Sequence, residues 1–273
     1  MNSGAIATII IPAHNEARVI ARTLRTLTAD AKPGEFDIIV VCNGCSDDTP
    51  AVAANVAHPD VRVLAIGESS KARAMSHGDL HAEAFPRLYL DADVELTASG
   101  ARAMALALEQ HQAAVATPVY RLDGCTSLAR QYWTEWQRRN PRPRAGTGCF
   151  GLSRAARLSF DSFPELLGDD LWVASTFGPV VVGAAETQVR LARTLPAVFK
   201  RRVRIERGNR ERPTDTAPQS QHSSREVTAR VDHTPAHRRA VGLFVVIGVH
   251  SSAAVWGKAR PAGGWAQDGT SRA

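Results

Sequence analysis

Four short apolar runs in the first 90 residues constrain the fold of this chain more than any other feature. They lie at residues 5–11, 36–41, 61–66 and 88–90. Short apolar runs of this kind are typical of buried parallel strands, and the run at 5–11 is also rich in β-branched residues. Segments that read as helices separate them, at residues 18–27, 49–57 and 69–81. Strand–helix alternation predicts an α/β fold with a mostly parallel central sheet and helices on both faces.

The alternating pattern continues to about residue 212. We expect a helix over residues 99–111, a strand over 113–118, a helix over 126–139, short strands at 179–184 and 188–191, and a basic helix over 199–212. The helix over 126–139 carries Leu128, Tyr132, Trp133 and Trp136 at helical spacing, which favours packing over a ligand platform.

Composition changes after residue 212. Residues 213–240 are mostly polar and hold several prolines and histidines, which predicts a flexible linker. Residues 241–256 are apolar again, but such a run is too short to span a membrane. We therefore predict a domain over residues 1–212, a linker over 213–240, and an apolar helix with a frayed end over 241–273.

Two carboxylates follow the fourth apolar run, in the sequence Asp91-Ala92-Asp93. Alternation along an extended segment would make both side chains point the same way, into the crevice beyond the strand's carboxyl end. Adjacent carboxylates repel unless a cation lies between them. Mg²⁺ commonly joins one or two carboxylates to substrate phosphates, so we hypothesise a metal site here. A strand followed by a solvated acidic turn is the alternative.

Polar residues also follow the first two runs and precede a later helix. Asn15 is placed to cap the next helix, with Glu16 in its first turn, and Ser46 or Asp47 can cap the helix over 49–57. A second acidic pair, Asp169-Asp170, lies just ahead of an apolar helix. From its local sequence alone, this pair is typical of helix N-capping.

Charge and cysteine usage narrow the classes of ligand and location. The net charge of +6 suits phosphate-rich ligands or an anionic membrane surface. Four cysteines are too few for a disulfide scaffold, so we expect free thiols in a reducing compartment and no redox role for Cys42 and Cys45. The N-terminal residues lack the pattern of a signal peptide. We therefore expect a cytoplasmic protein.

Several nucleotide-binding classes are unsupported. The chain has neither a G-x-G-x-x-G after a strand nor a P-loop, which argues against dinucleotide oxidoreductases and P-loop enzymes. The segment from Pro12 to Glu16 contains no glycine, whereas nucleotidyltransferases usually open with a glycine- and arginine-rich phosphate loop.

Taken in order, these landmarks resemble the GT-A glycosyltransferases of family 2. The resemblance rests on Ile11-Pro12-Ala13-His14-Asn15-Glu16, the segment from Asn43 to Thr49, Lys71-Ala72-Arg73-Ala74, Asp91-Ala92-Asp93, Gly146-Thr147-Gly148 and Asp169-Asp170. It covers roughly residues 5–210. The sequence departs from the family pattern at Asn43, where the family often has an acid that contacts the base. An amide offers a different donor and acceptor pattern, so the base is left open.

The resemblance implies an inverting transferase that uses a nucleoside diphosphate sugar and Mg²⁺ or Mn²⁺. It assigns nucleotide-sugar binding to Pro12, Glu16, Asn43, Arg73 and Asp91. It assigns the metal to Asp93 and Asp91, and the catalytic base to Asp170 with Asp169 beside it. The like charge of Asp169 is expected to raise the apparent pKa of the acidic pair. Arg201, Arg204 or Arg207 is expected to add a phosphate contact.

Two questions stay open at the level of sequence. A catalytically weak or inactive sugar-nucleotide-binding scaffold is the alternative function, and turnover of a donor sugar would distinguish it. A lipid-linked or polysaccharide acceptor is suggested by analogy, and we expect no nucleic-acid partner. We hypothesise that residues 199–212 and 241–256 form a peripheral contact with the inner membrane face. The alternatives are a solvated basic helix over 199–212 and a helix over 241–256 that docks on the protein's own surface.

Overall fold

In the computed structural model of the chain, the described residues are 4–140, 147–166, 168–208, 246 and 248–252. They form two compact units. The larger unit contains the described residues of 1–121 and 142–191, and the smaller unit those of 122–141 and 192–262. The predicted domain boundary at residue 212 and the predicted linker over 213–240 lie outside the described residues, so this division stays a prediction.

The described part of the larger unit is built on an eight-stranded sheet. In sheet order its strands are β3 (Val61–Ile66), β2 (Phe36–Asn43), β1 (Ala7–Ala13), β4 (Arg87–Leu90), β7 (Cys149–Leu152), β6 (Ala113–Arg121), β8 (Val180–Arg190) and β5 (Glu95–Leu96). Strand β1 pairs in parallel with β2 and β4, as β2 does with β3 and β6 with β8. Strand β7 is antiparallel to both neighbours, and β5 is antiparallel to β8. The predicted α/β fold is confirmed.

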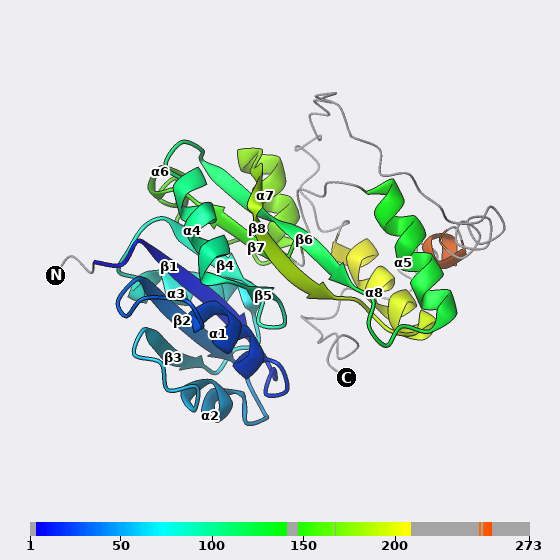
Figure 1. Cartoon of the computed structure of the whole chain (residues 1–273), viewed down its shortest axis with the longest axis horizontal. Coiled ribbons are helices and arrows are strands. Elements are labelled where there is room, and N and C mark those ends of the chain that lie inside the picture. Colours follow the sequence, from blue (N-terminus) through cyan, green and yellow to red (C-terminus); the bar gives the residue numbers. More distant parts are fainter. Residues whose placement is uncertain (1–3, 141–146, 167, 209–245, 247, 253–273) are drawn as a thin grey trace. The chain divides into compact units, whose positions relative to one another are not determined.

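Helices cover both faces of this sheet (Figure 1). They are α1 (Ile20–Thr28), α2 (Thr49–Ala54), α3 (Lys71–His81), α4 (Ala98–Ala107), α6 (Arg154–Arg157) and α7 (Asp169–Phe177). Helices α1 and α4 contact each other on one face, and α3 packs on β1 and β2 from the other. Side chains alternate along β1, so Ile10 faces α3 while its neighbours Ile9 and Ile11 face the opposite layer.

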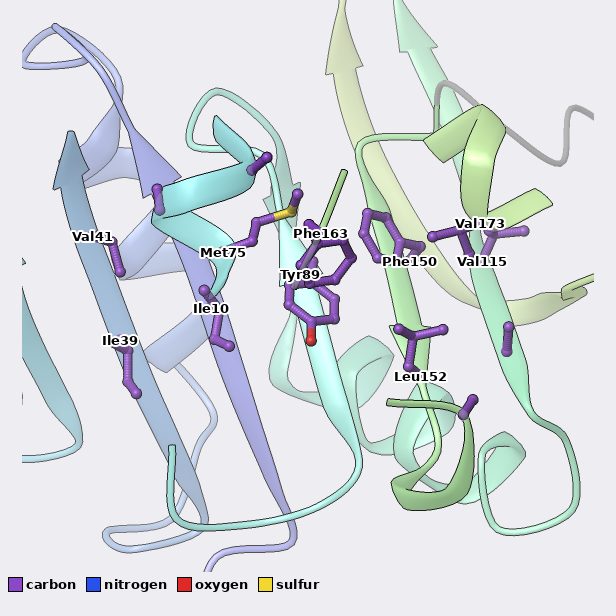
Figure 2. Close-up of a cluster of buried hydrophobic side chains, with 14 residues drawn as sticks. Ile10, Ile39, Val41, Met75, Tyr89, Val115, Phe150, Leu152, Phe163 and Val173 are labelled. Carbon is purple, nitrogen blue, oxygen red and sulfur yellow. The ribbon is translucent and has the colours of Figure 1, made fainter. Parts of the chain in front are cut away.

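The core beneath α3 joins the two halves of the sheet. Figure 2 shows Ile10 of β1, Tyr89 of β4 and Phe150 of β7 in one cluster with Met75 of α3 and Val173 of α7. The rings of Tyr89 and Phe150 stack with their centroids 4.9 Å apart. Because α3 and α7 share this apolar layer, the first residues of both helices are held at the same edge of the sheet.

A buried charged group anchors the other end of α3. The Asp79 carboxylate accepts hydrogen bonds from the Tyr89 hydroxyl at 2.9 Å and from Nε of Arg157 at 2.6 Å. Burial raises the pKa of Asp79, against the opposing effect of Arg157. These contacts tie α3 to β4 and α6 and so fix the direction in which α3 presents its N-terminal residues.

The order of strands reverses between β1 and β4. From β1 the chain runs outward through β2 to β3, then returns to place β4 on the other side of β1. In open α/β sheets such a switch point leaves a crevice outside the carboxyl ends of the strands, where ligands bind. The residues that follow β1, β2 and β4 are therefore the ones to inspect for a site.

Local patterns misassigned two helix starts. Helix α1 begins at Ile20 with Val19 as its N-cap and no side-chain cap, so the prediction that Asn15 caps it was wrong. Asn15 has a φ of +52° and its Oδ1 accepts the backbone N–H groups of Ser46 and Asp47 instead. Helix α2 has Asp48 as N-cap without a side-chain cap, although Oδ1 of Asp47 does accept the Thr49 N–H at 3.0 Å.

The two short strands predicted at 179–184 and 188–191 are one strand, β8. It pairs with β6 through Ala116 and Val182, then resumes with Thr117 opposite Glu186. This register shift interrupts the apolar pattern without ending the strand, because the extra residues are absorbed in an irregularity of the ladder.

The smaller unit contains α5 (Ser127–Arg139), α8 (Leu195–Gly208) and the helical residues 246 and 248–252. Tyr132 and Trp133 of α5 are buried, as the packing interpretation of the aromatic stripe predicts. Nε1 of Trp133 donates to the Ala192 carbonyl at 2.9 Å, and the Tyr132 hydroxyl lies 3.0 Å from Nε2 of His250. Within the described residues, no helix has the length and apolar character needed to cross a membrane.

The contact between α3 and β1 predicts the effect of Gly78→Ala. A Cβ atom at Gly78 would lie 2.6 Å from Cγ2 of Ile10. Alanine improves helix propensity by about 1 kcal/mol, but overpacking costs about 1–3 kcal/mol. We expect the free energy of unfolding, measured by urea denaturation, to fall by about 1 kcal/mol because the overpacking cost outweighs the gain in helix propensity.

Gly183→Ala is the control, because a Cβ atom at Gly183 meets nothing within 4 Å. Its effect should be smaller than about 0.5 kcal/mol, as for an ordinary surface substitution. A Gly78→Ala protein as stable as the wild type would show that α3 can move away from β1 at little cost.

Candidate active site

The Asp91-Ala92-Asp93 segment follows β4 at the switch point, and it forms a turn. The Val94 N–H donates to the Asp91 carbonyl at 3.1 Å, which closes the turn. The expectation that an extended backbone points both carboxylates the same way was therefore wrong. Both acids still lie at the carboxyl end of β4, each with a partly exposed side chain.

Gly148 holds this turn against the start of β7. The Asp91 N–H donates to the Gly148 carbonyl at 2.9 Å, and Gly148 has a φ of +73°. A Cβ atom at Gly148 would lie 2.5 Å from Cγ2 of Val94. Glycine is required for two reasons: it tolerates the left-handed backbone, and it leaves room for the turn that carries Asp91.

Lys71, the first residue of α3, connects Asp91 to the second acidic pair. Its Nζ lies 2.7 Å from Oδ1 of Asp91 and 2.9 Å from Oδ2 of Asp169. The Lys71 side chain is 22% exposed and that of Asp169 only 9%. Burial lowers the pKa of Lys71, but Asp169 and Asp91 together raise it further, so the pKa lies above its ordinary value and the amine is charged at neutral pH.

Asp169 and Asp170 form the first turn of α7 rather than its N-cap, which is Gly168. Oδ1 of Asp170 accepts the Leu171 N–H at 2.8 Å. Negative charge is favourable at a helix N-terminus, so the local interpretation of the pair as a helix-start signal is partly satisfied. The ion pair from Lys71 to Asp169 goes beyond that interpretation, because it joins α7 to the turn after β4.

The loops after β1 and β2 are fastened to each other. Asn15 accepts N–H groups from the second loop, as described above, and the Glu16 N–H donates to Oγ1 of Thr49 at 2.6 Å. Nδ1 of His14 lies 2.6 Å from the Asn43 carbonyl oxygen. These contacts join the two loops into one wall at the carboxyl ends of β1 and β2.

Three of the residues predicted to bind the nucleotide belong to this wall, and all are buried. Pro12 lies in β1 opposite Val41, Glu16 follows β1 and is 5% exposed, and Asn43 ends β2 with no exposed surface. Among the described residues no side chain hydrogen-bonds the Asn43 amide, neither at Oδ1 nor at Nδ2. Burying an amide group without a hydrogen-bond partner costs free energy. A ligand or a water molecule that hydrogen-bonds the Asn43 amide would remove this cost.

Two other residues predicted to bind the donor lie on helices, Arg73 on α3 and Arg204 on α8. Arg73 lies on the exposed side of α3, where its Nε pairs with Oε1 of Glu165 at 2.9 Å and its Nη1 with Glu68. Arg204 lies on α8 in the smaller unit, and its side chain is outside the described part of the chain. Their assigned roles stay predictions.

The donor set at the turn fits a hard divalent cation that takes further ligands from a substrate. Asp91 and Asp93 offer carboxylate oxygens, which Mg²⁺ and Mn²⁺ accept. Within the described residues, no three His, Cys, Asp or Glu side chains gather in a way that could hold a metal ion. Mg²⁺ sites of this kind commonly use one or two carboxylates plus phosphate oxygens, so this pair is compatible with a metal that binds together with a nucleotide.

Sequence reasoning missed Lys71 and Gly148. Both belong to motifs that carried the family resemblance, but the resemblance assigned a role to Arg73 and none to Lys71. The usable signal was charge balance: acids predicted to share one sheet edge need a cation, and a lysine opening the helix after the third strand can reach that edge. For Gly148 the signal was a glycine directly before a strand beside the acidic turn.

A family model described as "Glycosyl transferase family 2" matches residues 8–165. The curated glycosyltransferase AglD of Haloferax volcanii is 37% identical over 65 residues, which span 22% of this chain and 10% of that relative. The matched stretch is thus a small part of AglD.

Two solved structures share the fold at low identity. The mannosyltransferase PcManGT of Pyrobaculum calidifontis, solved with GDP-Man and Mn²⁺, is 16% identical with a TM-score of 0.60, and the match covers 94% of this chain and 76% of that one. S. aureus TarS 1-349 with UDP is 14% identical with a TM-score of 0.50, covering 73% of this chain and 64% of that one. The chain therefore spans less than two thirds of that TarS chain.

The packing of Gly148 against Val94 predicts the effect of Gly148→Ala. The added methyl group would push the acidic turn away from β7 and move the Asp91 carboxylate. We expect Mn²⁺ binding in the presence of UDP or GDP, measured by calorimetric titration, to weaken about tenfold, because small displacements of binding groups have large effects.

Gly178→Ala is the matched control. Gly178 also has a positive φ, +55°, but a Cβ atom there meets nothing within 4 Å. Both variants bear the backbone cost of a left-handed residue, and only Gly148→Ala should weaken Mn²⁺ binding. Equal Mn²⁺ binding by the two variants would contradict a role for Gly148 in placing Asp91.

Proposed function

The chain belongs to glycosyl transferase family 2, and we propose that it moves a sugar from a nucleoside diphosphate sugar to an acceptor hydroxyl with inversion at the anomeric carbon. The observation that carries the proposal is the charged cluster at the switch point. There Lys71 bridges Asp91, beside β4, and Asp169, at the start of α7. This cluster adjoins the strand ends at which ligands of open α/β sheets bind.

The nucleoside is proposed to lie along the wall formed by the loops after β1 and β2. Pro12 and Glu16 would shape it, and Asn43 would offer its buried amide to the base. An amide both donates and accepts a hydrogen bond, whereas a carboxylate only accepts. Asn43 therefore supports a base preference different from that of relatives with an acid there. Arg73 is proposed to contact the base or the diphosphate, and Arg204, or Arg201 or Arg207 beside it on α8, is proposed to contact the diphosphate.

Asp93 and Asp91 would hold the metal ion, Mg²⁺ or Mn²⁺, beside the diphosphate. When bound, the metal supplies positive charge that offsets the charge developing on the departing nucleoside diphosphate. The PcManGT structure contains GDP-Man with Mn²⁺, and the TarS structure contains UDP. Those ligands belong to these two proteins, and they favour a sugar-nucleotide donor here as well.

Asp170 is proposed to take the proton from the acceptor hydroxyl. The hydroxyl oxygen forms a bond to the anomeric carbon as the bond from that carbon to the diphosphate oxygen breaks. Asp169, next to it in the first turn of α7, forms an ion pair with Lys71. General-base catalysis of this kind typically contributes a factor of about 10²–10⁴ in rate.

The acceptor is proposed to be lipid-linked or a polysaccharide, reached at the membrane surface. Helix α8 carries the basic residues Lys200, Arg201 and Arg202, which would attract anionic lipid headgroups. Within the apolar run 241–256, Val246 is buried and His250 contacts Tyr132 of α5. This segment would therefore have to leave α5 to add the second signal that stable attachment requires.

Liposome flotation tests this attachment. The full chain should float with anionic liposomes, whereas a version that ends at Arg212 should stay in solution because a basic segment alone binds weakly. Identical behaviour of the two would rule out attachment through the C-terminal apolar segment.

Replacing the proposed base tests the proposed reaction. Asp170→Asn should slow donor turnover, measured as release of nucleoside diphosphate with and without acceptor, by at least about 100-fold while nucleotide affinity changes by less than about twofold. An amide keeps the shape of the side chain but cannot take the proton at neutral pH.

Asp161→Asn is the control, since Asp161 is an exposed acid ahead of the same helix. It should turn over like the wild type. Equal losses of turnover and nucleotide affinity in Asp170→Asn would show a binding role instead of a base. A wild-type chain that binds a sugar nucleotide and never turns it over would be a scaffold.

A further inference from the structure

The N-terminal end of α3 touches two segments that the proposed reaction requires to act together. Lys71 pairs with Asp91, a proposed metal ligand, and with Asp169, the neighbour of the proposed base. The two acids are far apart in the chain, and each lies at the start of a separate segment. The two ion pairs of Lys71 join these segments directly.

Further contacts reinforce the same junction. Oγ of Ser70 donates to Oε2 of Glu165 at 2.8 Å, and Nε of Arg73 donates to Oε1 at 2.9 Å. The Arg73 and Glu165 side chains are each 58% exposed, so this pair is screened by solvent and contributes little. The Lys71 ion pairs are more buried, and breaking a buried pair leaves an uncompensated charge. Among these charged contacts, the Lys71 ion pairs are therefore the stronger link between α3 and the start of α7.

We infer that Lys71 is a positioning residue that couples the donor side of the site to the acceptor side. It holds the Asp91 carboxylate and the first turn of α7 in a fixed relation, so that a base carried on α7 meets a donor bound at the turn after β4. The inference rests on the proposed function for its catalytic consequence. Its structural part, that the start of α7 depends on Lys71, stands without any ligand.

The ammonium group has a second effect on the same site. A carboxylate has two acceptor oxygens, so the contact of Lys71 with Oδ1 leaves Asp91 with a second oxygen that would be available to a metal ion. The positive charge of Lys71 nevertheless repels a divalent cation that binds beside it. Lys71 thus weakens metal binding by the free protein, while it keeps Asp91 and Asp169 in fixed positions for the reaction.

These two effects distinguish a positioning role for Lys71 from a purely structural role and from a role in diphosphate binding alone. Removal of a lysine that only stabilises the fold would lower the stability of the whole unit and leave metal affinity unchanged. Removal of a lysine that only binds the diphosphate would change nucleotide affinity and leave the start of α7 unchanged. A positioning lysine, once removed, loosens the start of α7 and tightens metal binding together.

The experiment compares Lys71→Met and Lys71→Arg with the wild type and with Lys32→Met, which removes an exposed lysine from a turn. In Lys71→Met, without ligand, we expect amide hydrogen exchange at residues 171–174 to rise about tenfold while β1 stays protected. Mn²⁺ affinity without nucleotide should rise about tenfold, because a neighbouring positive charge is gone. Donor turnover should fall about 100-fold because the base is misplaced.

Lys71→Arg should restore protection of residues 171–174. Lys32→Met should match the wild type in amide exchange, Mn²⁺ affinity and donor turnover.

Unchanged exchange at the start of α7, together with unchanged Mn²⁺ affinity, would overturn the inference. If Lys71→Met does not fold, the double variant Lys71→Met with Asp169→Asn removes the unpaired buried charge, and the same readouts apply to it. Failure of the proposed function looks different: the wild type would then bind neither Mn²⁺ with nucleotide nor a donor, while the exchange comparison would still decide the role of Lys71.

Discussion

The pairing of one ammonium group with two carboxylates is the interaction on which the proposed site depends. Asp91 and Asp169 come from separate segments, and like charges brought to one edge of a sheet repel. Lys71 lies between them with both ion pairs shorter than 3 Å. Because α3 is fixed at its other end by the buried Asp79 contacts, the ammonium group is held by the fold and not by a flexible loop.

The sheet topology explains why those groups meet. Strand order reverses between β1 and β4, and open α/β sheets bind ligands outside the carboxyl ends of the strands at such a point. The antiparallel strand β7 then brings Gly148 against the turn after β4. Met75 of α3 and Val173 of α7 lie in one apolar layer (Figure 2), and the Lys71–Asp169 ion pair joins the first turns of the two helices. Together these constraints place polar groups that no local pattern would assemble.

The sequence predicted β1, β2 and β4 because burial on both faces leaves a continuous apolar run, which is a local signal. Strands β5 and β7 were not predicted, and β8 was predicted as two strands. The family was likewise predicted from ordered motifs and is confirmed by the match over residues 8–165. Predictions failed where the decisive partner is distant in the chain: Asn15 binds the loop at Ser46 instead of capping its own helix. The role of Lys71 was missed for the same reason, since its partners lie in other segments.

Calorimetric titration of the protein with UDP, GDP and dTDP, each with and without Mn²⁺, tests the central claim most directly. The account predicts that one nucleotide binds tightly only when Mn²⁺ is present, and that Asp93→Ala abolishes this dependence while Asp30→Ala, at an exposed acid after α1, preserves it. Binding that is indifferent to Mn²⁺, or no binding of any of the three nucleotides, would contradict a metal-dependent sugar-nucleotide site at the turn after β4.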